Sequence, residues 1–155
     1  MDLRALEHRI PPPLVALVTA AGMWALARWW PLWRFEVPMP WLAGLLVASV
    51  GGVVSGLGAL AFRRARTTVN PLHPERATSV VTGGIYRHTR NPMYAGMVFV
   101  LLGCFVAFGA ASALLGLPAF VAYITRFQIG PEEQALKARF GSDYDDYRAR
   151  VRRWL

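Results

Sequence analysis

Three long stretches of this chain contain no charged residue. They cover residues 10–27, 37–62 and 91–125, which are 18, 26 and 35 residues long. A helix needs about 20 apolar residues to cross the hydrocarbon core of a bilayer. A soluble domain of 155 residues rarely goes so long without charge. The pattern predicts an all-α integral membrane protein that forms one domain over residues 1–155.

The third stretch is too long for one transmembrane helix. We expect it to fold as a helical hairpin that turns at residues 108–112, with residues 116–118 as a second candidate because Pro118 disfavours a regular helix. One long kinked helix is the alternative, and it would put the C-terminal tail on the opposite side of the membrane. The hairpin gives four transmembrane helices with the approximate bounds 11–30, 40–62, 92–108 and 111–127.

The basic residues give this arrangement an orientation. With four spans, the N-terminus, the second loop and the tail share one side, and that side holds 15 of the 17 Lys and Arg residues. Cytoplasmic segments carry the excess of basic residues, so we expect a multi-pass protein of the cytoplasmic (inner) membrane with both termini in the cytoplasm. Since topology accounts for the positive charge, we expect the lipid bilayer as a partner and no nucleic acid. We also expect the first apolar stretch to be kept as a span rather than cleaved as a signal peptide.

Two segments lie outside the expected spans. The loop over residues 63–92 is rich in Gly, Pro and Asn, and a structureless loop of that length is uncommon unless it is functional. The tail predicts a cytoplasmic helix over 131–153, which starts at Pro131 with two acids behind it and which Gly141 could interrupt. We expect its arginines at the lipid headgroups: Arg148, Arg150, Arg152 and Arg153.

Two short motifs on the cytoplasmic side carry the possible chemistry. Residues 83–96 begin with two glycines and contain two tyrosines, two arginines and an Asn-Pro turn at the point where a loop enters the bilayer. Glu132 and Glu133 place two carboxylates at a helix start, where they could hold a cationic group. Both motifs also have a purely structural interpretation, as a loop-to-helix turn and as acids that complement a helix dipole. The single cysteine, Cys104, excludes a multi-cysteine metal site, and we expect no metal.

Taken together, these motifs resemble those of the isoprenylcysteine carboxyl methyltransferase and phospholipid methyltransferase superfamily of small membrane enzymes. The resemblance covers roughly residues 60–155, with weaker similarity at residues 67–71 and 140–147. The matching positions are Gly84, Tyr86, Arg90, Asn91, Pro92, Tyr94 and Gly96, followed by Glu132, Glu133 and Leu136.

The resemblance implies a methyltransferase that uses S-adenosylmethionine at the cytoplasmic membrane face. By analogy with the family, Glu132 would bind the methionyl ammonium of the cofactor, while Arg90 and Glu133 would order the pocket or face the substrate as the catalytic pair. The full set implied for cofactor binding is Val81, Gly84, Tyr86, Asn91, Pro92, Tyr94, Gly96 and Glu132. Asn91 departs from the family pattern because the prenylcysteine enzymes have His there, and Asn does not titrate near neutral pH.

The methyl acceptor stays open at this point. The resemblance implies a lipophilic or membrane-associated acceptor whose reacting group is a carboxylate, an amine or a thiol. An amine or thiol would need a base, for which the nearby candidates are Glu133, Tyr86, His88 and His73. A non-catalytic membrane binding or assembly protein with the same fold is the alternative function. A transporter is disfavoured because no charged residue lies well inside a span. The oligomeric state is open.

Overall fold

The structure is a computed structural model that describes residues 10–65 and 79–155, and within these residues it is all-helical. Three long helices each begin with proline in the first turn, where the missing N–H is not needed: α1 (Pro12–Trp29), α2 (Pro40–Arg64) and α3 (Pro92–Phe108). A short 3₁₀ helix, η3 (Gly84–Arg87), precedes α3. The remaining elements are η4 (Ala111–Leu115), α4 (Gly116–Ile124), the π-helix η5 (Thr125–Ile129), α5 (Gly130–Phe140) and α6 (Ser142–Arg150).

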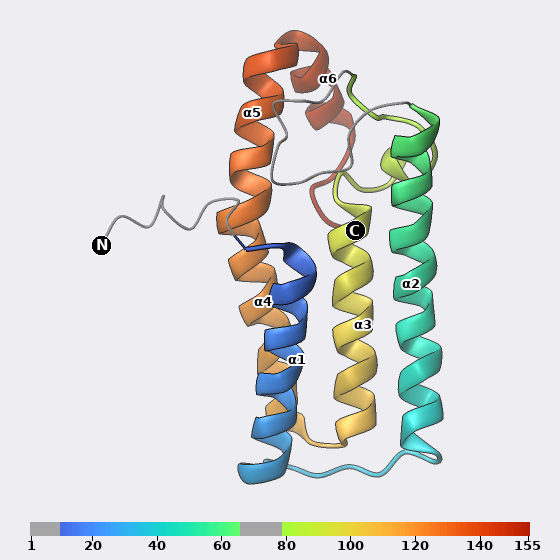
Figure 1. Ribbon diagram of the computed structural model, residues 1–155, viewed down its shortest axis with the longest axis vertical. Helices are drawn as coiled ribbons and strands as arrows, with labels where there is room; N and C mark the ends of the chain where they lie inside the picture. The colour runs from blue at the N-terminus through green and yellow to red at the C-terminus, as the bar shows by residue number, and fades with distance from the viewer. Residues whose placement is uncertain (1–9, 66–78) are drawn as a thin grey trace, which may run out of the picture.

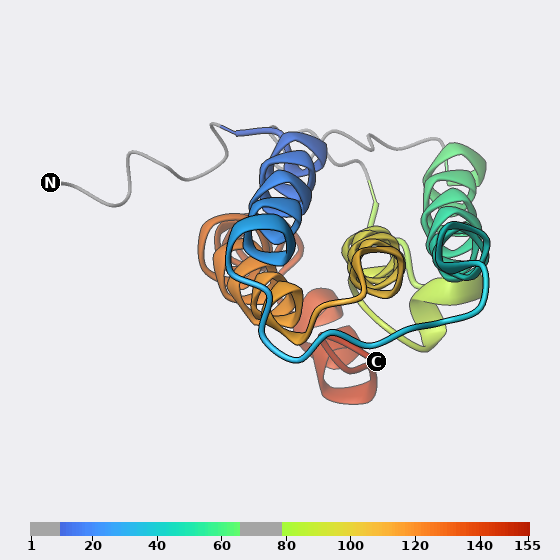
Figure 2. The same cartoon turned by 90° about the horizontal axis from the view of Figure 1, so that it is seen from below.

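The helices form a bundle with α3 in the middle. Figures 1 and 2 show α2 on one side of α3 and the pair α1 and α4 on the other. The start of α1, the end of α2, the start of α3 and the end of α4 all lie at the same end of the bundle. We call this the site end, because it also carries residues 79–91, α5 and α6.

Helices α2 and α3 approach each other through glycine. A Cβ added at Gly44 would lie 2.6 Å from the carbonyl oxygen of Gly103. A Cβ added at Gly96 would collide with the Ser55 hydroxyl and with the backbone of Gly51. Small residues allow backbones to pack closely where lipid supplies no hydrophobic drive between helices. The second helix is therefore held by close backbone contact with α3.

The other half of the bundle has a conventional apolar core. Helices α1, α3 and α4 bury large side chains against one another, and the largest of them are less than 2% exposed: Met23, Leu101, Phe120, Ile124 and Ile129. Protein interiors are packed densely, so this cluster sets the relative positions of three helices. The cluster also holds α4 and η5, which lead to the site end, against α1 and α3.

The chain turns back at residues 109–110. Gly109 ends α3 with φ of +63°, a left-handed conformation that glycine adopts without strain. The loop after α1 is joined to this turn, since the Phe35 N–H donates to the Gly109 carbonyl (3.0 Å) and Arg34 forms an isolated bridge with Ala110. The second candidate for the turn, residues 116–118, lies within continuous helix instead.

The predicted tail helix is present as α5, which has Pro131 in its first turn, but it is not separate from the preceding span, because one helical column runs from Ala111 to Phe140. Pro131 has no N–H to donate into the preceding turn. The turn before it widens to a π-helix, in which the Gly130 N–H donates to the Thr125 carbonyl, and the column continues. Gly141 separates α5 from α6 at a φ of +53°, which is the interruption that the sequence suggested.

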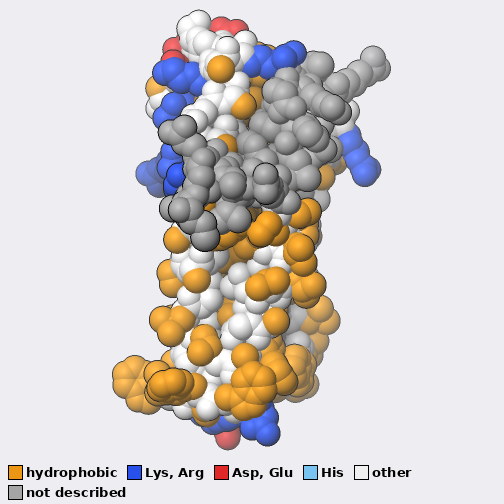
Figure 3. Space-filling model, turned by 60° about the vertical axis from the view of Figure 1, so that its left-hand side comes forward, with side chains coloured by type: hydrophobic (Ala, Val, Ile, Leu, Met, Phe, Trp, Pro, Cys, Tyr) orange, Lys and Arg blue, Asp and Glu red, His pale blue; other side chains and the backbone are white. Residues whose placement is uncertain are grey.

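Two of the helical columns, Pro40–Arg64 and Ala111–Phe140, are long and apolar enough to cross a membrane, and α3 is a shorter apolar helix. Large apolar side chains are exposed along α1 and α2, among them Leu17, Leu45 and Val53 at more than 60%. Figure 3 shows apolar side chains over the long shaft of the molecule and charged side chains at its ends. This surface is consistent with a membrane protein.

Candidate functional site

The two sequence motifs meet at the site end. The phenol of Tyr94, in the first turn of α3, donates to the Glu132 carboxylate in α5 at 2.5 Å. The guanidinium of Arg90, just before α3, donates to the Glu133 carboxylate at 2.9 Å. Residues 38 and 43 positions apart are thus joined because α3 and the α4–α5 column run side by side. The hairpin turn at Gly109 is what brings them together.

Glu132 is a carboxylate in an unfavourable place for charge. Burial raises its pKa to about 8, with a further raising effect from the adjacent Glu133, while the hydrogen bond from Tyr94 opposes the shift. Of the residues that the structure describes, none forms an ion pair with Glu132. It lies in α5, beyond the apolar part of the column. A buried carboxylate in this state is suited to a cationic ligand.

Glu133, in contrast, is fully engaged. Arg90 contacts its Oε1, and Arg153 makes a two-point contact, with Nε at 3.1 Å from Oε1 and Nη2 at 2.6 Å from Oε2. Such a forked arginine–carboxylate pair is among the stronger and more directional polar contacts. Glu133 is buried, and these two guanidiniums offset the cost of its charge.

The loop before α3 is tied to the C-terminal segment. The Asn91 side-chain amide donates to the Arg153 carbonyl at 2.9 Å, and the buried Thr89 hydroxyl donates to the same oxygen at 3.2 Å. The Arg90 N–H donates to the Arg152 carbonyl, and its Nη1 donates to the Arg148 carbonyl. Arg90 Nε is buried and has no partner among the described residues.

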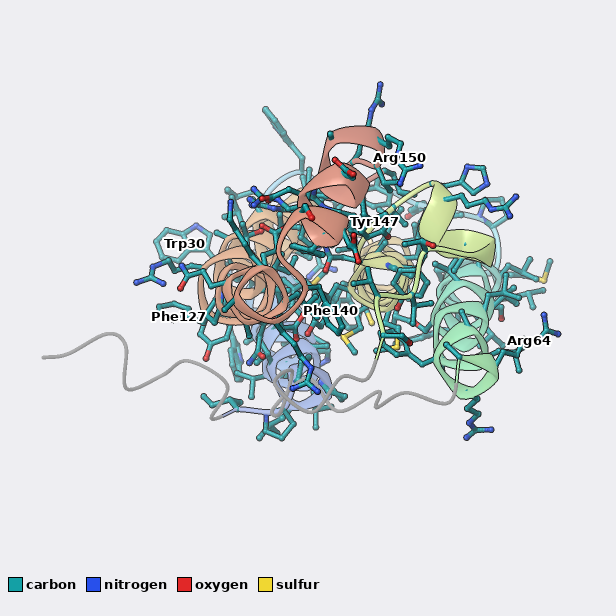
Figure 4. The ribbon with its side chains drawn as sticks, turned by 90° about the horizontal axis from the view of Figure 1, so that it is seen from above. Trp30, Arg64, Phe127, Phe140, Tyr147 and Arg150 are labelled. Carbon is teal, nitrogen blue, oxygen red and sulfur yellow. The ribbon has the colours of Figure 1, made fainter. Side chains whose placement is uncertain are left out.

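Tyr86 forms the inner part of η3. It is 5% exposed, its ring packs edge-on against Phe62 of α2, and its carbonyl accepts a hydrogen bond from the Tyr147 hydroxyl at 2.8 Å. Burial raises the pKa of its phenol, and the Tyr147 and Glu132 groups raise it further. Figure 4 shows Tyr147 pointing toward the middle of the site end. The Tyr86 phenol therefore lies in the neighbourhood of Glu132.

A hollow of about 410 Å³ opens on the α2 side of η3. The end of α2 forms one wall and residues 80–85 form the other, with Arg64 as its charged member. Val81 and Gly84 both line it, and Gly84 has a φ of +60° and is exposed. The hollow therefore adjoins the motif segment through the glycines that precede Tyr86.

The other positions named from the sequence fall outside this cluster of contacts. Pro92 is buried at the start of α3, and Gly96 packs against α2, which by itself accounts for a glycine there. His88 is exposed. Residues 67–71 and His73 lie outside the described residues. Within the described part of the chain, no three His, Cys, Asp or Glu side chains are grouped so as to hold a metal ion.

Three residues that the sequence did not single out take part in the site: Thr89, Tyr147 and Arg153. Arg153 was expected at the lipid headgroups, and that prediction is wrong, because its guanidinium turns inward to Glu133. Arg150 does point away from the site end (Figure 4). The sequence held one signal for Arg153. The adjacent carboxylates at positions 132 and 133 call for cationic partners, and Arg90 of the loop is only one of the two arginines that pair with Glu133.

Comparison with known proteins identifies the family. The family model described as phospholipid methyltransferase matches residues 40–143. Two proteins of Oryza sativa, one each from the subspecies indica and japonica, are named probable protein-S-isoprenylcysteine O-methyltransferase. Each is 31% identical over 111 residues, which is 70% of this chain and 56% of the rice protein. An uncharacterized protein of Haemophilus influenzae is 40% identical over 63 residues, which is 41% of this chain and all of that protein. No solved structure matches the chain significantly.

The matched region runs from the start of α2 into α6 and includes both motifs that meet at Tyr94 and Glu132. The structure and the comparisons agree on a helical membrane protein. This chain belongs to the phospholipid methyltransferase family.

Proposed function

We propose that this protein is an S-adenosylmethionine-dependent methyltransferase that acts on a lipophilic or membrane-associated acceptor at the cytoplasmic membrane face. The observation that carries the proposal is the meeting of the two motifs, in which Tyr94 holds Glu132 and Arg90 holds Glu133. The names of the rice relatives support methyl transfer as the reaction, although the match spans about half of their length.

Glu132 is the residue that fits the cofactor best. The methionyl part of S-adenosylmethionine carries an ammonium, and Glu132 is a buried carboxylate without an ion pair among the described residues. A cation placed beside it stabilises the ionised carboxylate, and the gain in ion pairing contributes to binding. Tyr94 holds the carboxylate in place for that contact.

The hollow beside η3 fits the nucleoside part. Val81 and Gly84 line it, and Tyr86, which directly follows the lining residue Ile85, is close enough to Glu132 for that carboxylate to raise the pKa of its phenol. Gly84 offers its backbone without a side chain in the way. A cofactor that extended from the hollow past Tyr86 would bring its ammonium toward Glu132. Asn91 and Pro92 would then set the start of α3 beside it.

When bound, the cofactor supplies an electrophilic methyl group on a sulfonium. The chain's own residues align the two reactants and keep water away, as Tyr86 and Tyr94 can do from buried positions and Glu132 from a half-buried one. Glu133 is committed to two arginines, which leaves it poorly placed to act as a base. Arg90 Nε is a buried donor in the motif segment that has no partner among the described residues. Of the three acceptor chemistries, a carboxylate fits best, because it needs a cationic donor and no base.

We further propose that α1, α2, α3 and the α4 column all cross the cytoplasmic (inner) membrane, with the site end and both termini in the cytoplasm. The basic residues of the second loop and the tail support this orientation. Helix α3, at 17 residues, is about 25 Å long, a little short of a bilayer core of about 30 Å, so local thinning accompanies it. The acceptor would then reach the site from the bilayer and the cofactor from the cytosol.

Calorimetry of the detergent-purified protein with S-adenosylmethionine tests the proposal. Wild-type protein should bind, and Glu132→Gln should bind about 10- to 100-fold more weakly, because a charged hydrogen bond contributes about 1.5–3 kcal/mol. Asp143→Asn is the matched control, since Asp143 is an exposed acid in α6 and should leave affinity unchanged. Absence of binding at millimolar cofactor would count against an enzyme.

A second measurement separates catalysis from binding alone. Membranes that contain the protein are incubated with cofactor labelled in the methyl group, and the lipid extract is analysed by mass spectrometry. Label in a lipophilic product is the expected result, and base-labile label would identify a methyl ester. Cofactor binding without any transfer would favour the non-catalytic alternative.

A further inference from the structure

The chain returns to the site after its last helix. Helix α6 ends at Arg150, where the Val151 N–H still donates to the Tyr147 carbonyl, and the backbone then becomes extended. Trp154 packs against the apolar core. Between these two points lies Arg153, whose backbone and side chain both face the motif segments. The last residues of the chain are therefore a wall of the site.

Arg153 joins the C-terminal segment to α5 and to the loop before α3. Its guanidinium holds both oxygens of Glu133 on α5, and its carbonyl accepts from Thr89 and Asn91 in the loop before α3. Two further carbonyls accept from Arg90, that of Arg152 in this segment and that of Arg148 in α6. These contacts fix the loop relative to α5, and α5 carries Glu132.

The charges around Glu132 depend on this arrangement. Glu133 is its neighbour in the chain, and two arginines neutralise it from opposite sides, Arg90 from the loop and Arg153 from the C-terminal segment. The titratable groups close to Glu132 come from several elements of the site end: Tyr94 of α3, Tyr86 of η3, Tyr144 of α6 and Glu133 of α5. Arg90 and Arg153 act on Glu132 through Glu133, with which both form ion pairs.

We propose that Arg153 is a positioning residue of the site. By holding and neutralising Glu133 and by fixing Thr89 and Asn91 through its carbonyl, it leaves the neighbouring Glu132 carboxylate free to ionise and to bind a cation. The C-terminal segment thus sets the charge of the cofactor site without touching the cofactor. This inference rests on the proposed function, in which Glu132 binds the ammonium.

Two substitutions should shift the pH profile of cofactor binding in opposite directions. Arg153→Gln leaves Glu133 less neutralised, so the midpoint of the profile should move up by about one pH unit and affinity at pH 7 should fall about tenfold. Glu133→Gln removes the neighbouring negative charge, so the midpoint should move down by about the same amount. A merely structural role for the cluster would weaken binding in both variants without opposite shifts.

Two further variants complete the comparison. Arg153→Lys keeps the charge and should keep the wild-type midpoint, although it loses the two-point contact. Arg150→Gln is the matched control, because Arg150 is exposed, bonds only the Asp146 carbonyl in the described structure and points away from the site, so its profile should not change. The measurement is calorimetric titration of S-adenosylmethionine into each detergent-purified, full-length variant from pH 6 to 9.

The outcomes distinguish this inference from the proposed function. An unchanged midpoint in Arg153→Gln, or an equal shift in Arg150→Gln, overturns the role of Arg153 while wild-type binding still stands. Wild-type protein that does not bind at any pH overturns the proposed function itself. If Arg153→Gln does not fold, Glu133→Gln still tests the charge that Arg153 neutralises, and an unchanged midpoint in that variant overturns the inference.

Discussion

At the scale of single residues, the contact between Tyr94 and Glu132 has the clearest chemical consequence. The phenol hydrogen bond favours the ionised carboxylate, whereas burial favours the protonated one, and burial prevails so that the pKa of Glu132 rises to about 8. The same carboxylate on the surface of a protein would be ionised throughout the neutral range. The structure therefore makes the charge of this site sensitive to pH.

Cofactor affinity should consequently depend on pH. A cationic ligand binds the ionised form of Glu132, and because the raised pKa lies near 8, the ionised fraction grows about tenfold per pH unit below that value. Calorimetric affinity should rise from pH 6 to pH 8 and then level off. Glu132→Gln should show a flat profile, and a slope that survives in that variant would assign the titration to another group.

Removing the Tyr94 hydroxyl should move this profile. Tyr94→Phe deletes the hydrogen bond that stabilises the ionised carboxylate, so the midpoint should rise by about one pH unit and affinity at pH 7 should fall about tenfold. Tyr123→Phe is the matched control, because the Tyr123 hydroxyl is buried without a partner among the described residues. Equal effects in the two variants would show that general packing, rather than this bond, is responsible.

At the scale of elements, α2 depends on glycine for its place in the bundle. It packs against α3 with hardly any large side chain between the two backbones, and its other face is exposed. The hollow beside η3 has the end of α2 as one wall and residues 80–85 as the other, so the position of α2 relative to the segment that leads into α3 sets the width of that hollow. Packing and site geometry are thus linked through this pair of helices.

Gly96→Ala should destabilise the bundle. The added methyl group would collide with Ser55 and Gly51, and overpacking of this kind typically costs about 1–3 kcal/mol. The melting temperature in detergent should fall measurably. Gly52→Ala is the control, since nothing lies within 4 Å of a Cβ at Gly52, and a stability equal to wild type or slightly higher is expected. Equal losses in both variants would contradict the close packing.

In the long column from η4 to α5, a local sequence signal for a helix start lies inside a continuous helix. Pro131 followed by two acids predicts a helix start, and chemically the prediction is sound. The preceding turn nevertheless stays helical by widening at residues 125–129. Ile124, just before this turn, and Ile129, at its end, are both packed into the core. Tertiary packing stabilises a helix through a position that local preferences would interrupt.

At the scale of the whole molecule, the two ends of the bundle differ in character. The far end carries exposed aromatic side chains around the first loop, among them Trp29, Trp30, Trp33 and Trp41. The site end carries the charged network around Glu133. Aromatic belts lie at membrane interfaces and basic residues lie on the cytoplasmic side, so this difference supports the proposed orientation, in which the site end faces the cytoplasm.

Cysteine labelling tests this orientation. Cys104 is the only cysteine of the chain, so Cys104→Ala gives a background for single cysteines. In bacterial spheroplasts that express the protein, a membrane-impermeant maleimide should label Trp33→Cys from outside. It should label Arg150→Cys only after permeabilisation, since both positions are exposed but lie at opposite ends of the bundle. Labelling of both positions from the same side would contradict four spans.

Much of this architecture followed from the sequence by simple physics. Uncharged stretches of 18 to 35 residues predict helices in a membrane protein, and the structure is all-helical in the part that it describes, with two columns apolar enough to cross a bilayer. The two motifs predicted the family, and that prediction is confirmed. Local composition sufficed for both, because helix formation in a bilayer and motif chemistry depend on residues that are near in sequence.

Only the tertiary structure decided how the charges of the site are paired. Arg153 looked like one more basic residue of an exposed tail, and nothing near it in sequence indicates that it would hold Glu133 or that its carbonyl would hold Asn91. Whether a helix continues through Pro131 was likewise decided by packing around it. The reason is the same in both cases: an ion pair or a buried contact between distant residues depends on the position of the whole backbone, which no single segment specifies.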